Sequence, residues 1–197
     1  MLHRQILSMI DLMKSDLPLT PSQTLGPYFA IGLNQTENEG RLASPLGNEI
    51  TGEGEIISIA GRVIDGNGDP VPDALIEIRQ ADASGSFSNP GFFGLARSHT
   101  GENLEAKYSF ITIKTGAATE LEAPYISVAI YMRGLLTHVY TRLYFSDESS
   151  ANEKDALLNQ VSEARQHTLI AHHNESEGIY EFDIHMQGKN ETVFFHL

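Results

Sequence analysis

The chain has 197 residues, a formal net charge of −13 at pH 7 and no cysteine. The negative charge argues against nucleic acid and anionic membranes as partners. The lack of cysteine excludes disulfides and thiolate metal sites and fits a reducing cytoplasm. No apolar run approaches the roughly 20 residues of a membrane span. The length therefore predicts one large domain, or one domain with arms.

Residues 1–17 are interpreted as an N-terminal extension, either a short amphipathic arm or a disordered segment. Polar and charged residues interrupt its apolar positions, and no small-residue cleavage site follows, so it is unlike a signal peptide. The alternative interpretation is that translation starts later, at Met9 or Met13.

Residues 18–55 are predicted to form an extended arm followed by a polar, glycine-rich loop. The segment 18–34, PLTPSQTLGPYFAIGLN, contains three prolines and two glycines, which disfavours a helix and predicts a turn at Gly26-Pro27. Its aromatic residues, Tyr28 and Phe29, are expected to pack against the chain's own core, the wall of a site or another subunit.

Residues 56–197 are predicted to form one all-β domain. Apolar and polar residues alternate in eight segments: 56–64, 74–80, 108–114, 125–133, 139–145, 168–172, 178–187 and 192–195. Residues 81–103 and 115–121 are predicted to be loops, and one or two short helices are expected within 146–166. Seven or eight strands with little helix indicate an antiparallel β-sandwich.

The most informative stretch is residues 123–148, APYISVAIYMRGLLTHVYTRLYFSDE. One face of its first strand is apolar, and the other carries two tyrosines, a serine and Arg133. Since the planar guanidinium of arginine matches a carboxylate and aromatic neighbours can hold it, Arg133 is a candidate ligand for a carboxylated aromatic molecule. The alternative is a structural ion pair or a stack on tyrosine, and this alternative is stronger for Arg142 on the next strand.

The eight histidines have poor spacing for a metal site. His172 and His173 are adjacent, so in a strand they would point to opposite faces. The remaining histidines are isolated or lie in polar or terminal contexts, and all eight are interpreted as surface or locally bonded residues. No metalloprotease, phosphate-loop or serine-nucleophile motif is present, so spacing alone predicts no catalytic residue and no metal site.

Five segments in order resemble the intradiol ring-cleaving dioxygenases: TPSQTLGPYF, GRVIDGNGDPVPDALIEIRQADASG, YSFITIKTG, RGLLTHVYTRLYFSDE and KNETVFF. The resemblance covers residues 18–197. It implies a β-sandwich and cleavage of a catechol ring by O2 at a ferric iron bound by two tyrosines and two histidines. It also implies a complex of two kinds of chain with the same fold, of which only one kind binds the iron.

This sequence lacks the iron ligands of that family. Iron-binding chains carry tyrosine and tryptophan where this chain has residues 117–120, and an HIH pair of ligands where it has residues 125–127. The loop 86–94 contains no tyrosine, and the family's arginine and glutamine near the site correspond to Glu122 and Arg142. The resemblance therefore implies no metal ligand and no catalytic residue in this chain alone, and it assigns the ferric iron to a partner chain.

The resemblance leaves this chain a substrate-binding role at the interface with the iron-binding chain. By position, the arm and strand-end residues that would line the substrate pocket are Arg133, Thr24, Gly26, Pro27 and Tyr28. The expected function is the non-iron subunit of a cytoplasmic hetero-oligomeric dioxygenase. The alternative is a non-enzymatic β-sandwich module for binding or structure, and a stand-alone dioxygenase is disfavoured by the missing ligands.

Overall fold

A computed structural model describes residues 33, 46–101 and 105–196 of the chain. Its strands are β1 (Ile56–Ile64), β2 (Leu75–Arg79), β3 (Leu95–His99), β4 (Lys107–Ile113), β5 (Tyr125–Tyr131), β6 (Val139–Phe145), β7 (Ile170–Asn174), β8 (Ile179–Glu181) and β9 (Ile184–His185). Its helices are α3 (Ser149–Asn152), α4 (Glu163–Gln166) and the 3-10 turns η1 (Leu158–Gln160) and η2 (His167–Leu169). None of the described helices is long and apolar enough to cross a bilayer.

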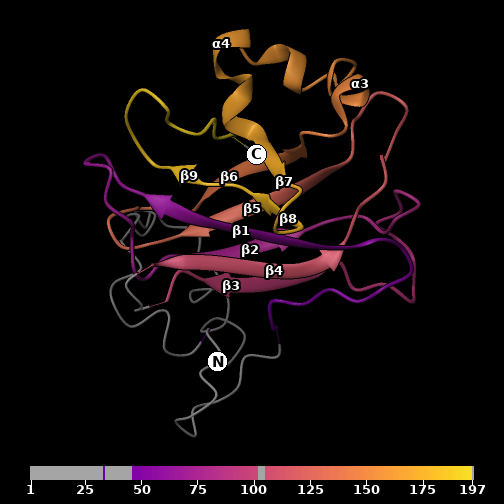
Figure 1. Cartoon of the computed structure of the whole chain (residues 1–197), viewed down its shortest axis with the longest axis horizontal. Coiled ribbons are helices and arrows are strands. Elements are labelled where there is room, and N and C mark those ends of the chain that lie inside the picture. Colours follow the sequence, from indigo (N-terminus) through magenta and orange to yellow (C-terminus); the bar gives the residue numbers. More distant parts are fainter. Residues whose placement is uncertain (1–32, 34–45, 102–104, 197) are drawn as a thin grey trace, which may run out of the picture.

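The strands form one hydrogen-bonded sheet in the order β3-β2-β5-β6-β7-β8-β1-β4, with β9 beside β1. The pairs β6–β7, β1–β8 and β1–β9 are parallel, so the sheet is mixed rather than purely antiparallel. It curls until its two ends approach each other, and the short helices gather over β6 and β7 at the opposite side (Figure 1). The all-β class with a few short helices is confirmed, whereas the division into two sandwich layers stays a prediction.

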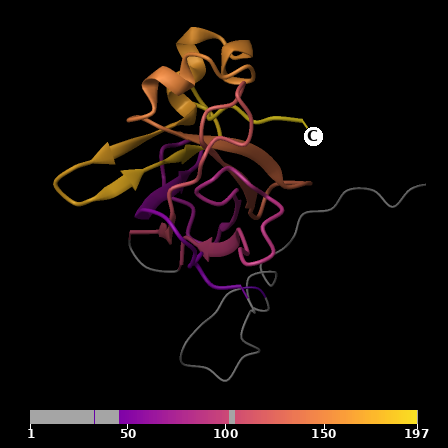
Figure 2. The same ribbon diagram turned by 90° about the vertical axis from the view of Figure 1, so that its right-hand side faces the viewer.

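Residues 47–50 close the gap between β3 and β4. The Arg97 amide of β3 donates to the Gly47 carbonyl at 2.8 Å, and Ile111 of β4 exchanges hydrogen bonds with Asn48 and Ile50 at 3.1 and 2.9 Å. Residues 47–50 therefore form a short backbone bridge between the edge strands β3 and β4. Figure 2 shows the curled sheet from the side.

The alternation of apolar and polar residues that predicted the strands also identifies which residues form the core. Inward-facing residues of β1, β2, β4, β5 and β6 fill the interior of the curled sheet, among them Ile59, Ile76, Phe110, Ile126 and Phe145. A smaller apolar cluster lies on the outer face of β6, under the short helices, and consists of Ala123, Tyr144, Leu158 and Leu169. The helices therefore cover one end of the outer face of β5 and β6.

The sequence located most strands to within two residues. Strands β1 and β6 have the bounds expected, while the segment 178–187 is broken into β8 and β9, and 192–195 contributes only a bridge at Phe195. The prediction of a loop throughout 81–103 was wrong, because β3 lies within it. Its buried face is made of Ala96 and Ser98, two small side chains that give no apolar alternation.

Candidate functional site

Arg133 lies at a tight turn just after the end of β5. The Leu135 amide donates to the Met132 carbonyl at 3.4 Å, and Gly134 has a φ of 91°, values that fit a type II turn with Arg133 at its second position. The positive φ favours glycine at this place. The Arg133 side chain is 53% exposed, so the turn presents a guanidinium at the rim of the sheet.

Asp73 is the ion-pair partner of Arg133. Strands β2 and β5 are antiparallel, and Leu75 of β2 faces Tyr131 of β5. The same register, carried two residues further, brings Asp73 opposite Arg133, and the Asp73 carboxylate contacts the Arg133 Nε. The structural alternative considered for Arg133 therefore exists as a contact, and a role in ligand binding stays a prediction.

A polar cluster continues from this turn across the outer faces of β2, β3, β5 and β6. Glu77 forms an ion pair with Arg97 and accepts a hydrogen bond from the Tyr131 hydroxyl at 3.4 Å. The Tyr131 ring stacks on His138, and the His138 Nε2 is bonded to the Tyr140 hydroxyl. Burial and the Glu77 carboxylate raise the pKa of Tyr131 to about 12, so this phenol is a neutral hydrogen-bond donor at physiological pH.

The arm approaches this cluster at its one described residue. The Arg97 guanidinium donates to the Leu33 carbonyl at 3.4 Å, beside its ion pair with Glu77. The arm residues predicted to bind substrate, Thr24, Gly26, Pro27 and Tyr28, lie outside the described residues, so their roles stay predictions.

At the other end of the same outer face, Arg142 is enclosed. Its guanidinium carbon lies 3.6 Å from the centre of the Tyr125 ring, and its Nη1 contacts the Glu122 carboxylate at 3.2 Å. The side chains of Arg142 and Glu122 are 20% and 24% exposed. The ion pair and the stack on tyrosine that were considered for Arg142 are both present.

Tyr144 and Asp155 extend this enclosed group beneath the helices. The fully buried Tyr144 hydroxyl donates to Asp155 Oδ1 at 3.1 Å and accepts a 3.5 Å contact from Arg142. Asp155 also accepts hydrogen bonds from the backbone amides of Ala123, Leu157 and Leu158. The group therefore fastens the loop before β5 and the helical segment onto the sheet.

A ferric ion does not fit these side chains. At the positions that the resemblance in the sequence matches to two iron ligands, the outward side chains are those of Tyr125 and Ser127. The Arg142 guanidinium already lies against the Tyr125 ring, and its positive charge would repel a metal cation. Burial also raises the pKa of Tyr125, which opposes formation of the phenolate that binds iron. Within residues 46–101 and 105–196, no group of three or more histidines and carboxylates is arranged to hold a metal.

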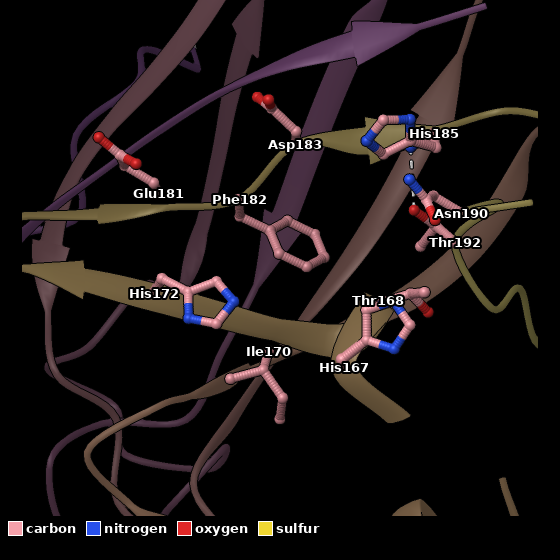
Figure 3. Close-up of a pocket in the computed structure, with 10 residues that line it drawn as sticks. All are labelled: His167, Thr168, Ile170, His172, Glu181, Phe182, Asp183, His185, Asn190 and Thr192. Atoms are coloured by element: carbon pink, nitrogen blue, oxygen red, sulfur yellow. Dashed lines mark hydrogen bonds between the residues drawn. The ribbon is translucent and has the colours of Figure 1, made fainter. Parts of the chain in front are cut away.

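A shallow pocket of about 220 Å³ opens beside β7, β8 and β9 (Figure 3). It is lined by His167, Thr168, Ile170, His172, Glu181, Phe182, Asp183, His185, Asn190 and Thr192. His172 faces this pocket while its neighbour His173 stacks on Tyr180, so the two histidines point to opposite faces as predicted. The sequence did not predict the pocket, because its lining combines three strands with η2 and residues 190–192, and the pattern does not reveal how these segments pack.

The comparisons with known proteins agree with the fold. A family model described as dioxygenase matches residues 25–188. The chain is 42% identical to the protocatechuate 3,4-dioxygenase alpha chain of Burkholderia cepacia, over 91% of this chain and 98% of that one. It is 40% identical to the alpha chain of Pseudomonas putida, over 91% and 96% of the two chains.

More distant relatives share the architecture. The protocatechuate 3,4-dioxygenase beta chain of Burkholderia cepacia is 27% identical, over 89% of this chain and 78% of that one. The solved structure of an intradiol ring-cleavage dioxygenase from Tetranychus urticae has a TM-score of 0.57 at 16% identity, over 86% and 96% of the two chains, which supports the fold. Because the family match spans most of the sequence and the alpha-chain relatives match over nearly their whole lengths, the chain belongs to the dioxygenase family of intradiol ring-cleaving enzymes.

Proposed function

We propose that this chain is the non-iron alpha subunit of a protocatechuate 3,4-dioxygenase. The observation that carries the proposal is that the chain is more similar to the alpha chain than to the beta chain of the same bacterium. The enclosed Arg142–Tyr125–Glu122 group supports the same conclusion, because the resemblance matches Tyr125 to an iron ligand of the family and the other two residues to an arginine and a glutamine near the site.

In the proposed complex, O2 opens the ring of 3,4-dihydroxybenzoate between its two hydroxylated carbons and gives 3-carboxy-cis,cis-muconate. Ferric iron held by the beta subunit supplies the activation of the catechol toward O2. This chain completes the substrate pocket, contributes a positive charge and stabilises its partner. No catalytic residue is assigned to this chain alone.

The residue proposed to bind the substrate carboxylate is Arg133. Its guanidinium is exposed at the rim of the sheet, where a carboxylate on a bound ring can reach it. The arm residues Thr24, Gly26, Pro27 and Tyr28 are proposed to form the adjoining wall. The contact between Arg97 and the Leu33 carbonyl supports this, because Leu33 follows Tyr28 by only five residues.

The proposed assembly is a hetero-oligomer of alpha and beta chains in the cytoplasm. A chain with no cysteine suits a reducing compartment, and its charge of −13 gives no support to a nucleic-acid or membrane partner. Both chains would have the β-sandwich of the family.

The test is to express this chain alone and together with a same-fold chain of its genome that carries the two tyrosine and two histidine ligands. Iron content, visible absorbance and protocatechuate turnover are measured for both preparations. We expect the chain alone to be colourless, iron-free and inactive, and the complex to be coloured and active. Iron and turnover in the chain alone would contradict the proposal, and a failure of the two chains to associate would favour the non-enzymatic module.

A further inference from the structure

We propose that Asp73 is a positioning residue that aims the Arg133 guanidinium at the carboxylate of the aromatic substrate. The inference rests on the proposed function, since it needs a carboxylated substrate at this rim. It adds a residue from the turn before β2 to the proposed site, which otherwise consists of the arm and the turn after β5.

The backbone beneath Asp73 is firmly held. The next residue, Ala74, donates its amide to the Thr100 hydroxyl at 3.0 Å, and the Thr100 amide donates back to the Ala74 carbonyl at 3.0 Å. Ala74 and Thr100 are fully buried. The Asp73 side chain is only 19% exposed, whereas that of Arg133 is 53% exposed. The carboxylate is therefore the fixed member of the pair and the arginine the adjustable one.

The contact uses only the inner edge of the guanidinium. Asp73 contacts the Nε of Arg133, and neither terminal nitrogen, Nη1 or Nη2, has a partner among the described residues. A carboxylate can take two parallel hydrogen bonds from such a terminal pair. Asp73 thus holds one edge of the planar group while the opposite edge stays available for a second carboxylate.

Two effects of Asp73 on substrate binding oppose each other. Its negative charge weakens the attraction between Arg133 and an incoming carboxylate, but at this exposed rim water and salt screen that effect. Its contact restricts a long, flexible side chain to one orientation before the substrate arrives, which reduces the entropy lost on binding. We expect the second effect to be larger, so removing the Asp73 charge should weaken substrate binding.

The experiment measures steady-state kinetics of the alpha–beta complex with two substrates, protocatechuate and catechol, which lacks the carboxylate. For the Asp73→Asn variant we expect the KM for protocatechuate to rise about fivefold while kcat changes less than twofold. Both parameters for catechol should stay unchanged. Asp69→Asn is the matched control, because it removes the same charge from an exposed turn residue whose carboxylate makes no hydrogen bond or ion pair among the described residues. Asp73→Ser replaces the asparagine variant if that variant does not assemble.

The outcomes separate this inference from the proposed function. If Arg133→Ala raises the KM for protocatechuate and Asp73→Asn leaves it unchanged or lowers it, the positioning role is wrong and the proposed function stands. An equal change for protocatechuate and catechol would also overturn the positioning role, since it would show a general structural effect. A wild-type complex without protocatechuate turnover would overturn the proposed function and this inference together.

Discussion

Arg133 follows β5 and Arg142 lies in the neighbouring strand β6, and both have tyrosines nearby in the sequence, yet their surroundings are opposite. Arg142 is 20% exposed and contacts an aromatic ring, a carboxylate and a phenol. Arg133 is 53% exposed and has Asp73 as its one partner among the described residues. An arginine with several enclosed partners links parts of the fold, while one with a single partner keeps hydrogen-bond donors for a ligand.

The two ends of the outer face of β5 and β6 differ in the same way. The short helices and the loop before β5 cover the end at Tyr144, whereas the Arg133 side chain at the other end is 53% exposed. The resemblance matches Tyr125, at the covered end, to an iron ligand of the family, and the predicted substrate contact, Arg133, lies at the exposed end. Under the proposed function, the absence of metal ligands at one end therefore need not remove the binding groups at the other.

The largest effect on stability is expected from Arg142→Ala. The substitution leaves the Glu122 carboxylate half-buried without its cation and removes the stack on Tyr125, which together should cost about 2 kcal/mol of unfolding free energy. Urea denaturation of the chain measures it. Arg62→Ala is the control, because Arg62 is an exposed arginine of β1 with no ion pair among the described residues. Equal losses for the two variants would contradict the linking role of Arg142.

The next effect concerns binding rather than stability. Arg133→Ala should raise the KM of the complex for protocatechuate about tenfold, equivalent to about 1.4 kcal/mol. Since an exposed ion pair contributes little, the unfolding free energy should change by less than about 0.5 kcal/mol. Kinetics and denaturation of the same preparation measure both quantities. A large loss of stability with an unchanged KM for Arg133→Ala would contradict its binding role and would show that Arg133, like Arg142, links parts of the fold.

A smaller loss of stability is expected from Tyr144→Phe. The variant keeps the buried ring and loses the hydrogen bond to Asp155, while two backbone amides still donate to the same carboxylate oxygen. Since no acceptor is left without a donor, the cost should be about 1 kcal/mol. Thermal denaturation measures it, and a cost equal to that of Arg142→Ala would show that the phenol, rather than the arginine, is the centre of the enclosed group.

The smallest effect depends on pH only in the acid range and concerns the loop beside the enclosed end. Hydrogen bonds from Asn89, Ser84 and Ser86 lower the pKa of Asp82 from 3.8 to about 2. Because the folded pKa is the lower one, the ionised carboxylate stabilises the fold above pH 3.8, and this contribution disappears as the pH falls towards 2. Asp82→Asn should therefore lower the melting temperature above pH 4 and converge with the wild type near pH 2. A constant difference across this range would contradict the assignment.

The sequence predicted the features that follow from the local alternation of apolar and polar residues. The bounds of β1 and β6, the polar outer face of β5 and the short helices all follow from period and composition. The same pattern could not find β3, because Ala96 and Ser98 are small enough to pack against the core without a hydrophobic signal. A strand buried through small residues is indistinguishable from a loop in the sequence.

The contacts of the candidate site depend on strand register, which the sequence does not reveal. Asp73 and Arg133 are 60 residues apart, and only the pairing of Leu75 with Tyr131 brings them together. The meeting of Arg142 with Glu122 likewise depends on how the loop before β5 folds back. Arginine itself was recognisable as a candidate, but its partner, and therefore its role, was not.

The backbone hydrogen bonds of residues 47–50 also protect the edges of β3 and β4 from pairing with other chains. Without them, β3 and β4 would each present unpaired amides and carbonyls along an open edge, and such edges pair readily with strands of other molecules. A chain that begins after Ile50 should consequently aggregate, although Ile50 is the one described core residue that it would lose. Residues 47–50 thus cover strand edges at which a second chain could otherwise pair.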